Sequence, residues 1–426
     1  MSLLWGVLAA AGVSCLSLIL LPVSIRRGIV ALFVVTSLLV GWTPTAPNSV
    51  RTPVLIGAIL TFIFFSLGDR PSAPCKRSRL ITQATLVLVF MSVAVTAIRQ
   101  PNSMSVIVQF GALWIAVSVF ASKFTSQDSS IFYSGFIVVA LIQLGFGLLE
   151  FFVLREPLLW GYGSYVDGTT LELRNPFLDN VSLRVQGSSG HPIVFGLVMA
   201  CLVAITLARW SEMKPLWRVA ACTVAFAGLV LSGSRSPIIA LFLAASYCLV
   251  LEKRSSSILR SLAYAAGIAF AVLLANAVLL STFESFQATG SYTNRLGGLQ
   301  SVPKLFDRDI PDIFFGSGFG SELELFRRGF LQQNGFNIVD NQFVTSLATG
   351  GLVGLVLTVI IIIAAFRASD RTARTLTVLF VAMMFSFDLL KWPSISAILF
   401  LVARMSTWTT EAQNEEETAV KQGGLK

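Results

Sequence analysis

Apolar stretches of membrane-spanning length recur along almost the whole chain, separated by short polar segments. A helix needs about 20 apolar residues to cross the bilayer core, and stretches that approach this length lie at about 3–21, 28–42, 54–68, 80–98, 104–121, 131–153, 192–208, 216–233, 236–251, 261–280, 342–366 and 375–390. A shorter apolar segment at about 394–404 either crosses once more or re-enters the membrane from one side. We expect the shorter spans, of about 15 residues, to extend into flanking polar residues or to pack inside the bundle.

The composition agrees with this pattern. Hydrophobic residues make up 55% of the 426 residues and charged residues 12%, with a mean hydropathy of +0.77, whereas soluble domains carry about 25% charged residues. We therefore predict an all-α polytopic integral membrane protein with about 12–13 transmembrane helices. One membrane domain covers 1–410, and the polar tail 411–426 is expected to be disordered. The first span lacks a basic leader and precedes Arg26, Arg27 and further spans, so we expect it to be retained.

The basic residues predict the orientation of the chain, because they are concentrated in every second loop. These residues are Arg26, Arg27, Arg70, Lys76, Arg77, Arg79, Lys123, Arg209, Lys214, Arg218, Lys253, Arg254, Arg260, Arg367, Arg371 and Arg374. The positive-inside rule puts their loops in the cytoplasm. The N-terminus and two long loops, 154–191 and 281–341, then lie outside. Three arginines, Arg184, Arg235 and Arg295, consequently stand on the side that normally avoids cations.

The composition also disfavours several classes of ligand. The net charge of +9 sits mostly in short loops that set the topology, so we do not expect nucleic acid binding. His191 is the single histidine, and the five cysteines are scattered along the chain. Neither a metal site nor a disulfide framework is therefore predicted, and we expect no cofactor.

The two long exterior loops combine aromatic residues with acids, amides and glycines. The first holds Trp160, Tyr162 and Tyr165, and the second holds Tyr292 among several phenylalanines. Aromatic rings stack on sugar faces and polar groups bind hydroxyls, so these loops suit sugar binding. The alternative is an interfacial aromatic belt that anchors helices at the membrane surface.

The segment from Arg184 to Pro192 places a cation beside the start of a helix. Gly187 and Gly190 allow tight turns, and Pro192 suits the first position of the following span. Backbone N–H groups at a helix N-terminus, together with a nearby arginine, form an anion site. The alternative is that Arg184 meets lipid headgroups and His191 only caps the helix.

The turn from Ser232 to Pro237 places a second arginine, Arg235, between two spans. An arginine close to apolar surroundings needs an anion as partner. Snorkelling of the side chain to the lipid headgroups is the ordinary alternative.

The longer exterior loop carries the third arginine, Arg295, and a glycine-rich piece. Gly316 and Gly318 allow the backbone to approach a ligand closely, but no predicted strand precedes them, so a nucleotide site is not expected. Asp340 and Asn341 fall just before a span. Asp340 is either the N-cap of that helix or a carboxylate that accepts a proton from an incoming sugar hydroxyl.

In their order and spacing, these motifs resemble the O-antigen ligase and polymerase superfamily (Wzy/WaaL type). The motifs are Arg184…Gly187…His191-Pro192, Ser232-Gly-Ser-Arg235-Ser, Arg295 before Gly316-Ser-Gly-Phe-Gly320, and Asp340-Asn341-Gln-Phe343 before Gly350 and Gly351. The resemblance covers roughly 180–355. It implies a GT-C-like, inverting and metal-independent glycosyltransferase. Such an enzyme acts on donors and acceptors that carry glycans on undecaprenyl diphosphate, at the outer face of the cytoplasmic (inner) membrane.

The resemblance also implies roles for individual residues. The diphosphate clamp, which stabilises charge on the leaving group, consists of Arg184, Arg235 and Arg295. The base is His191 or Asp340, unless the departing diphosphate makes a base unnecessary. The expected substrate contacts are Tyr292, Gly316, Gly318 and Asn341.

Two departures from the family pattern bear on the reaction. Ligases of this family tend to have His where this chain has Asp340, and the Trp that often follows the loop arginine is replaced by Gly297 and Gly298. The first departure favours a polymerase or an exopolysaccharide-type relative, with a chain-length regulator left open as a further partner. A ligase that attaches finished polymer to a different acceptor is the alternative enzyme.

A transporter or flippase for anionic or lipid-linked solutes is the alternative from another class. Transporters carry charged residues deep in their spans. Here only Glu150 and Asp388, each near the end of a span, approach that position.

Overall fold

The computed structural model describes residues 18–67, 76–161, 164–166, 169–171, 175–178, 183–251, 290–333, 337–367 and 370–405. In these ranges the chain is helical apart from connections and one small hairpin, β1 (Ser164–Val166) with β2 (Thr169–Leu171). The predicted span 261–280 and most of 3–21 lie outside the described residues. Seven of the described helices are long and apolar enough to cross a membrane, which confirms the predicted all-α polytopic membrane protein.

The long helices follow the predicted spans closely. They are α2 (Val23–Gly41), α3 (Asn48–Leu67), α4 (Lys76–Arg99), α5 (Met104–Ala121), α6 (Ser126–Leu149), α8 (Pro215–Ser232) and α14 (Gln342–Phe366). A 3₁₀ turn, Pro101–Ser103, leads into α5, and a π turn, Glu150–Leu154, extends α6. The start of α6 is fixed by a capping box, in which the Thr125 side chain and the Asp128 carboxylate each accept a backbone N–H of the other residue.

Shorter helices complete the bundle. They are α7 (Pro192–Ala208), α9 (Arg235–Ser246, continued by the π turn Tyr247–Leu251), α15 (Arg371–Met384) and α16 (Pro393–Met405). Every residue of α16 is buried, because α16 packs against α2, α5, α14 and α15. The apolar segment predicted at 394–404 is therefore an interior helix. Its 13 residues span about 20 Å, which suits a helix that other helices shield from lipid.

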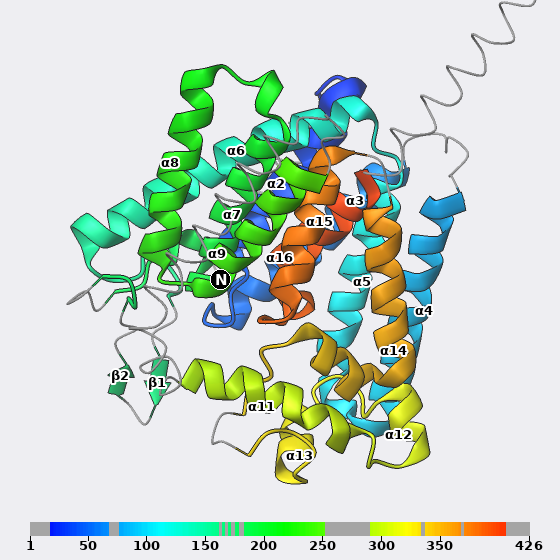
Figure 1. Cartoon of the computed structure of the whole chain (residues 1–426). Coiled ribbons are helices and arrows are strands. Elements are labelled where there is room, and N and C mark those ends of the chain that lie inside the picture. The colour runs from blue at the N-terminus through cyan, green and yellow to red at the C-terminus, as the bar shows by residue number, and fades with distance from the viewer. Residues whose placement is uncertain are drawn as a thin grey trace, which may run out of the picture.

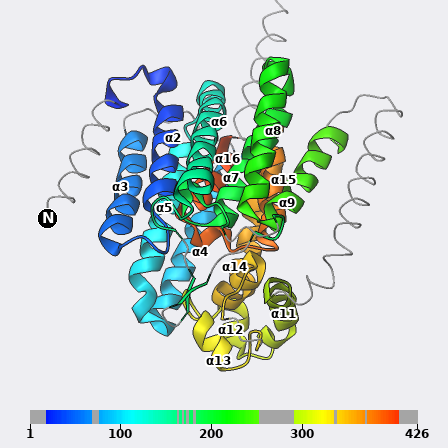
Figure 2. The same cartoon turned by 90° about the vertical axis from the view of Figure 1, so that its left-hand side faces the viewer.

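The polar segments predicted to lie outside gather at one end of the bundle (Figure 1). The hairpin and three helices, α11 (Gly290–Leu305), α12 (Ile310–Phe315) and α13 (Glu322–Arg327), occupy that end, and Figure 2 shows α11–α13 grouped at the same end of α14. The described part of the predicted exterior loop 281–341 thus contains short helices as well as irregular chain. Apolar residues of α11, α13 and the following turn pack on the first turns of α14 and form a second, smaller core.

The opposite end of the bundle carries the basic residues predicted to face the cytoplasm. Arg27 donates to the carbonyl of Lys123 at 2.7 Å, and Arg209 donates to the carbonyl of Ser130 at 3.1 Å. Arg371 donates to the carbonyl of Cys248 at 3.1 Å. The basic residues thus lie at the end opposite the hairpin and α11–α13, which agrees with the predicted alternation of loops. The side of the membrane that each end faces stays a prediction.

Candidate functional site

Two of the predicted arginine motifs lie together. Arg184 donates from Nε to the carbonyl of Ser232 at 3.0 Å and from Nη2 to Oγ of Ser234 at 2.9 Å. Both acceptors belong to the turn between α8 and α9, in which Gly233 has a φ of 60°. An added Cβ at Gly233 would lie 3.2 Å from Nε of Arg184, so the glycine lets the guanidinium settle against the backbone. Arg235 follows directly as the first residue of α9 and is half-buried.

Side chains of α6 hold the segment that precedes α7. One carboxylate oxygen of Glu150 accepts the backbone N–H groups of Gln186 and Gly187 at 2.8 and 2.9 Å. The other oxygen accepts the N–H of Leu158 at 2.9 Å, and Gln143 accepts the N–H of Ser188 at 3.1 Å. Glu150 therefore anchors the backbone beside Arg184, a role that its position near a span end did not indicate.

His191 caps α7. Its Nδ1 accepts the N–H of Ile193 at 3.1 Å, and its ring lies 5.1 Å from that of Trp392 and 5.8 Å from that of Phe387. Burial, followed by the positive charge of Arg184, lowers the pKa of His191 to about 3. An imidazole that is neutral near pH 7 and has Nδ1 engaged is a weak proton acceptor. The geometry therefore supports the capping interpretation of His191 over its predicted role as base.

The N-cap of α14 is Asn341 and not Asp340. The Asn341 Oδ1 accepts the N–H groups of Phe343 and Val344 at 3.0 and 3.1 Å, and its Nδ2 donates to the carbonyl of Phe385 at 3.2 Å. The capping interpretation of Asp340 is therefore wrong by one residue. Asp340 is half-buried and lines a cavity, whereas the side chain of Asn341 is engaged within the protein, so the geometry gives no support to its predicted contact with substrate.

The glycine-rich piece fits into a break in α14. Gly351 has a φ of 63° and a ψ of −164°, which interrupts the helix. The N–H groups of Ser317 and Gly318 donate to the carbonyls of Ala348 and Thr349 at 3.1 and 3.0 Å. Gly316 has a φ of 78°, and a Cβ there would lie 2.2 Å from the carbonyl oxygen of Thr349. The backbone conformation and the close packing against α14 therefore explain why glycine stands here. The substrate contacts predicted for Gly316 and Gly318 stay predictions.

A buried arginine completes this junction. Arg308 donates to the carbonyls of Leu347 and Ala348 at 3.0 and 2.9 Å and to Oγ of Ser317 at 3.0 Å. Carbonyls that a broken helix leaves without partners must be satisfied by other donors. Arg308, which the motifs did not single out, therefore stabilises the break in α14.

Arg295 and Tyr292 lie on α11, which packs against α14. Their side chains fall outside the described part of the chain. Their predicted contacts with the diphosphate and the sugar therefore stay predictions.

A polar cavity of about 970 Å³ opens at the end of the bundle that carries α11–α13. Aromatic rings form much of its wall, since Trp42 lies 5.6 Å from Phe110 and 6.2 Å from Trp392, and Phe110 lies 5.8 Å from Phe319. The polar residues that line it are Asn48, Arg51, Thr52, Ser105, Gln109, His191, Glu322, Asn337, Asp340, Asp388 and Lys391. Rings beside amides and carboxylates can bind a sugar by stacking and by hydrogen bonds to its hydroxyls.

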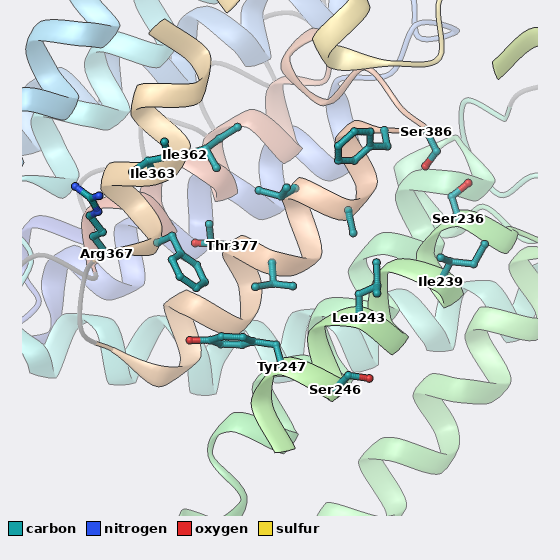
Figure 3. Close-up of a pocket in the computed structure, with 15 residues that line it drawn as sticks. Ser236, Ile239, Leu243, Ser246, Tyr247, Ile362, Ile363, Arg367, Thr377 and Ser386 are labelled. Carbon is teal, nitrogen blue, oxygen red and sulfur yellow. The ribbon is translucent and has the colours of Figure 1, made fainter. Parts of the chain in front are cut away.

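A second cavity, an apolar groove of about 920 Å³, runs between α9, α14 and α15 (Figure 3). Ser236 and Ser386 lie at one end of the groove, and Tyr247 and Arg367 lie toward the other end. Leucine, isoleucine and valine side chains line most of the length between them. Ser236 follows Arg235 directly, so the groove begins beside the turn that binds Arg184.

One short segment separates the two cavities. It is the connection between α15 and α16, from Phe385 to Trp392. Phe385 and Ser386 line the apolar groove, whereas Phe387, Asp388, Lys391 and Trp392 line the polar cavity. The arrangement can hold an apolar chain on one side of this connection and a sugar on the other.

Comparison with known proteins gives a family match for part of the chain. The family model described as O-antigen ligase (Wzy_C) matches residues 220–359, and no curated protein matches the chain. The matched range begins after Arg184 and His191 and includes Arg235, Arg295, Gly316, Gly318, Asp340 and Asn341. In the described part of the chain, no three His, Cys, Asp or Glu side chains cluster as metal ligands would. This match covers 140 of the 426 residues and supports the resemblance to the O-antigen ligase and polymerase superfamily that the motifs of this membrane protein predicted.

Proposed function

We propose that the protein polymerises lipid-linked oligosaccharide repeat units at the outer face of the cytoplasmic membrane. The donor is a growing glycan on undecaprenyl diphosphate, and the acceptor is the sugar hydroxyl of the next lipid-linked unit. The reaction inverts the anomeric carbon and needs no metal ion. The family match supports a role in joining polysaccharides, and the substrate, the direction of transfer and the mechanism belong to the proposal.

The observation that carries the proposal is the pair of cavities on either side of the Phe385–Trp392 connection. The apolar groove suits the polyprenyl chain of the donor. Its end beside Arg235 lies next to the turn that binds Arg184, so the diphosphate would meet cationic side chains there. The planar guanidinium binds phosphate oxygens with paired hydrogen bonds.

The polar cavity suits the acceptor sugar. An acceptor hydroxyl attacks the anomeric carbon of the donor on the face opposite the diphosphate. The bond between that carbon and the diphosphate oxygen breaks, and the electron pair leaves with the diphosphate. Fixed positive charges at the leaving oxygen lower the barrier in the way that a metal ion does elsewhere.

A ligase is the second candidate, because the matched family model is described as O-antigen ligase. A ligase would transfer finished polymer to a different acceptor with the same chemistry. We favour the polymerase because Asp340 stands where ligases of this family tend to have His.

Transfer by the purified protein tests the proposal. In liposomes that contain undecaprenyl-diphosphate-linked repeat units, the wild type should produce lipid-linked oligomers, and the yield should survive EDTA. Arg184→Lys should reduce the rate by about 10-fold or more, since one ammonium cannot replace the two bonds to Ser232 and Ser234. Arg155→Lys, at an exposed arginine of the same end of the bundle, is the control and should leave the rate unchanged. Strict dependence on a divalent ion would contradict the mechanism.

A further inference from the structure

A buried ionic cluster lies in the wall of the polar cavity. The Nζ of Lys391 lies 2.6 Å from Oε1 of Glu322 and 2.9 Å from Oδ2 of Asp388. The side chains of Asp388 and Glu322 are only 9% and 14% exposed. One ammonium thus neutralises two carboxylates, and Glu322 comes from α13 whereas the other two residues belong to the connection that separates the cavities.

A small polar chamber lies next to this cluster. Its volume is about 40 Å³, and side chains of α4, α5 and α14 surround it. Hydroxyl groups line it, those of Ser92, Thr345, Ser346, Thr349 and Thr358. A space of this size with several polar partners can hold water, because one water needs about 10–15 Å³ by this measure.

Asp388 stands between the chamber and the larger cavity. Asp388, Lys391 and Phe319 line both spaces. The Lys391 ammonium approaches Oδ2 of Asp388 at 2.9 Å, and the Thr345 hydroxyl also hydrogen-bonds to the carboxylate and lowers its pKa. A carboxylate can accept about four hydrogen bonds, so these two donors leave part of its acceptor capacity open. A buried carboxylate without a full set of donors is costly unless water supplies them.

We propose that Asp388 takes up, through water, the proton that the acceptor hydroxyl loses during glycosyl transfer. This inference rests on the proposed function. As the hydroxyl oxygen bonds to the anomeric carbon, the diphosphate leaves with the electron pair of the broken C–O bond. The hydroxyl proton passes to a water at the boundary between the two spaces and from there to the Asp388 carboxylate. The carboxylic acid later returns the proton to the aqueous cavity.

The surroundings of Asp388 favour it as the proton acceptor over His191 and Asp340, the two candidate bases that the resemblance implied. Burial raises the pKa of Asp388 above its usual value, Lys391 opposes this shift, and Glu322 adds to it. A carboxylate with a raised pKa holds a proton more readily near neutral pH. His191 is engaged as a helix cap and stays neutral, and Asp340 lines the cavity without contact to the chamber.

The charged groups around Asp388 come from several elements. Lys391 lies on its own connection and Glu322 on α13. Asp340 precedes α14, and Arg51 of α3 and His191 at the start of α7 line the same cavity. Of these groups, Lys391 and Glu322 are the ones that shift the pKa of Asp388, so they are the ones to change.

The pH dependence of the transfer rate tests the role of Asp388. The substrate is the lipid-linked repeat units extracted from cells that lack the protein, and the enzyme is the purified full chain in liposomes. Asp388→Asn should lower the rate about 100-fold or more and remove the acidic limb of the pH profile, since the deprotonated carboxylate is the active form.

Two neighbouring variants should shift that limb in opposite directions. Lys391→Met removes the charge that lowers the pKa of Asp388, so the limb should move to higher pH. Glu322→Gln removes the charge that raises the pKa, so the limb should move to lower pH. Glu324→Gln, at an exposed position on the same helix, should leave the profile unchanged, and Lys391→Arg should keep the fold and the charge.

The outcomes separate the inference from the proposed function. If the wild type forms no product at any pH, the proposed function fails. If the wild type is active but Asp388→Asn keeps its rate and pH profile, Asp388 is not the proton acceptor. Shifts in the same direction for Lys391→Met and Glu322→Gln would also overturn the inference, because a merely structural cluster has no reason to produce opposite signs.

Discussion

Arginines at the end of the bundle that carries α11–α13 differ in what their guanidinium groups contact. Arg308 is buried and donates to backbone carbonyls and a serine, so its charge is used to stabilise the broken helix α14. Arg184 is half-buried, contacts a turn and stands beside Arg235. Sequence position alone did not separate Arg308 from Arg184 and Arg235, because all three lie between predicted spans and not within one. Burial and hydrogen-bond partners do separate them.

His191 gives a prediction about stability and pH. Its pKa is about 3 in the folded protein and about 6.5 in an unfolded chain, so the unfolded state binds the proton first as the pH falls. The wild-type thermal stability should therefore decrease between about pH 6.5 and pH 3. His191→Asn, which can still cap α7, should lack this contribution to the decrease. An equal slope in the variant and the wild type, measured by thermal unfolding in detergent, would contradict the assignment.

The N-cap of α14 shows that sequence alone cannot assign a capping role between two adjacent residues. Asp and Asn are about equally good N-caps, so the pair Asp340-Asn341 does not reveal which residue caps α14. Tertiary packing decides, because only Asn341 can both cap the helix and donate to the Phe385 carbonyl. This register leaves the carboxylate of Asp340 at the cavity.

At the scale of elements, the long apolar helices were predictable and the structure of the longer polar segments was not. Hydrophobic length identifies a span without knowledge of its neighbours: α5 and α14 match their predicted ranges, and α3 starts six residues before its predicted range of 54–68. In contrast, α11–α13 are short helices of mixed polarity that are stabilised by packing on α14. Short helices of this kind have little intrinsic stability. The sequence pattern over 281–341 therefore predicted only a long loop.

The break in α14 gives a prediction with a neighbouring control. Gly351 has a backbone conformation that other residues rarely adopt, and a Cβ there would lie 2.4 Å from the carbonyl carbon of Phe314. Gly351→Ala should therefore destabilise the protein by about 1–3 kcal/mol from strain alone and should lower the melting temperature. At Gly350 the nearest atom to a Cβ is a methionine methyl at 3.9 Å, so Gly350→Ala should be tolerated. Equal stability of the two variants would show that the break is not required.

At the scale of the whole molecule, the candidate site is assembled from distant parts of the chain. The polar cavity takes Trp42, Arg51 and Gln109 from the first helices and Phe319, Asp388 and Lys391 from the second half. The first five predicted spans resembled the family only in being hydrophobic, so no motif pointed to their cavity residues. Two of the predicted arginine motifs, by contrast, do lie together, because Arg184 binds the turn before Arg235, and their binding of an anion stays a prediction.

The topology gives a prediction for the whole molecule. Glu324 on α13 and Lys214 before α8 are exposed, and α13 and the start of α8 lie at opposite ends of the bundle (Figure 1). In a variant without native cysteines, a membrane-impermeant maleimide should label Glu324→Cys in intact cells and Lys214→Cys only after permeabilisation. The reverse pattern would place the candidate site in the cytoplasm, where the proposed substrate orientation fails.

The central claim is that the chain joins lipid-linked repeat units at a site that includes Arg235. The most direct measurement is a gel of surface and lipid-linked polysaccharide from cells lacking the protein, complemented with the wild type or with Arg235→Ala. We predict that the ladder collapses to single repeat units and that only the wild type restores it, with both proteins present in the membrane at equal amounts. Full-length polymer stranded on its lipid carrier would instead identify a ligase. Unchanged glycans in cells lacking the protein would contradict the account.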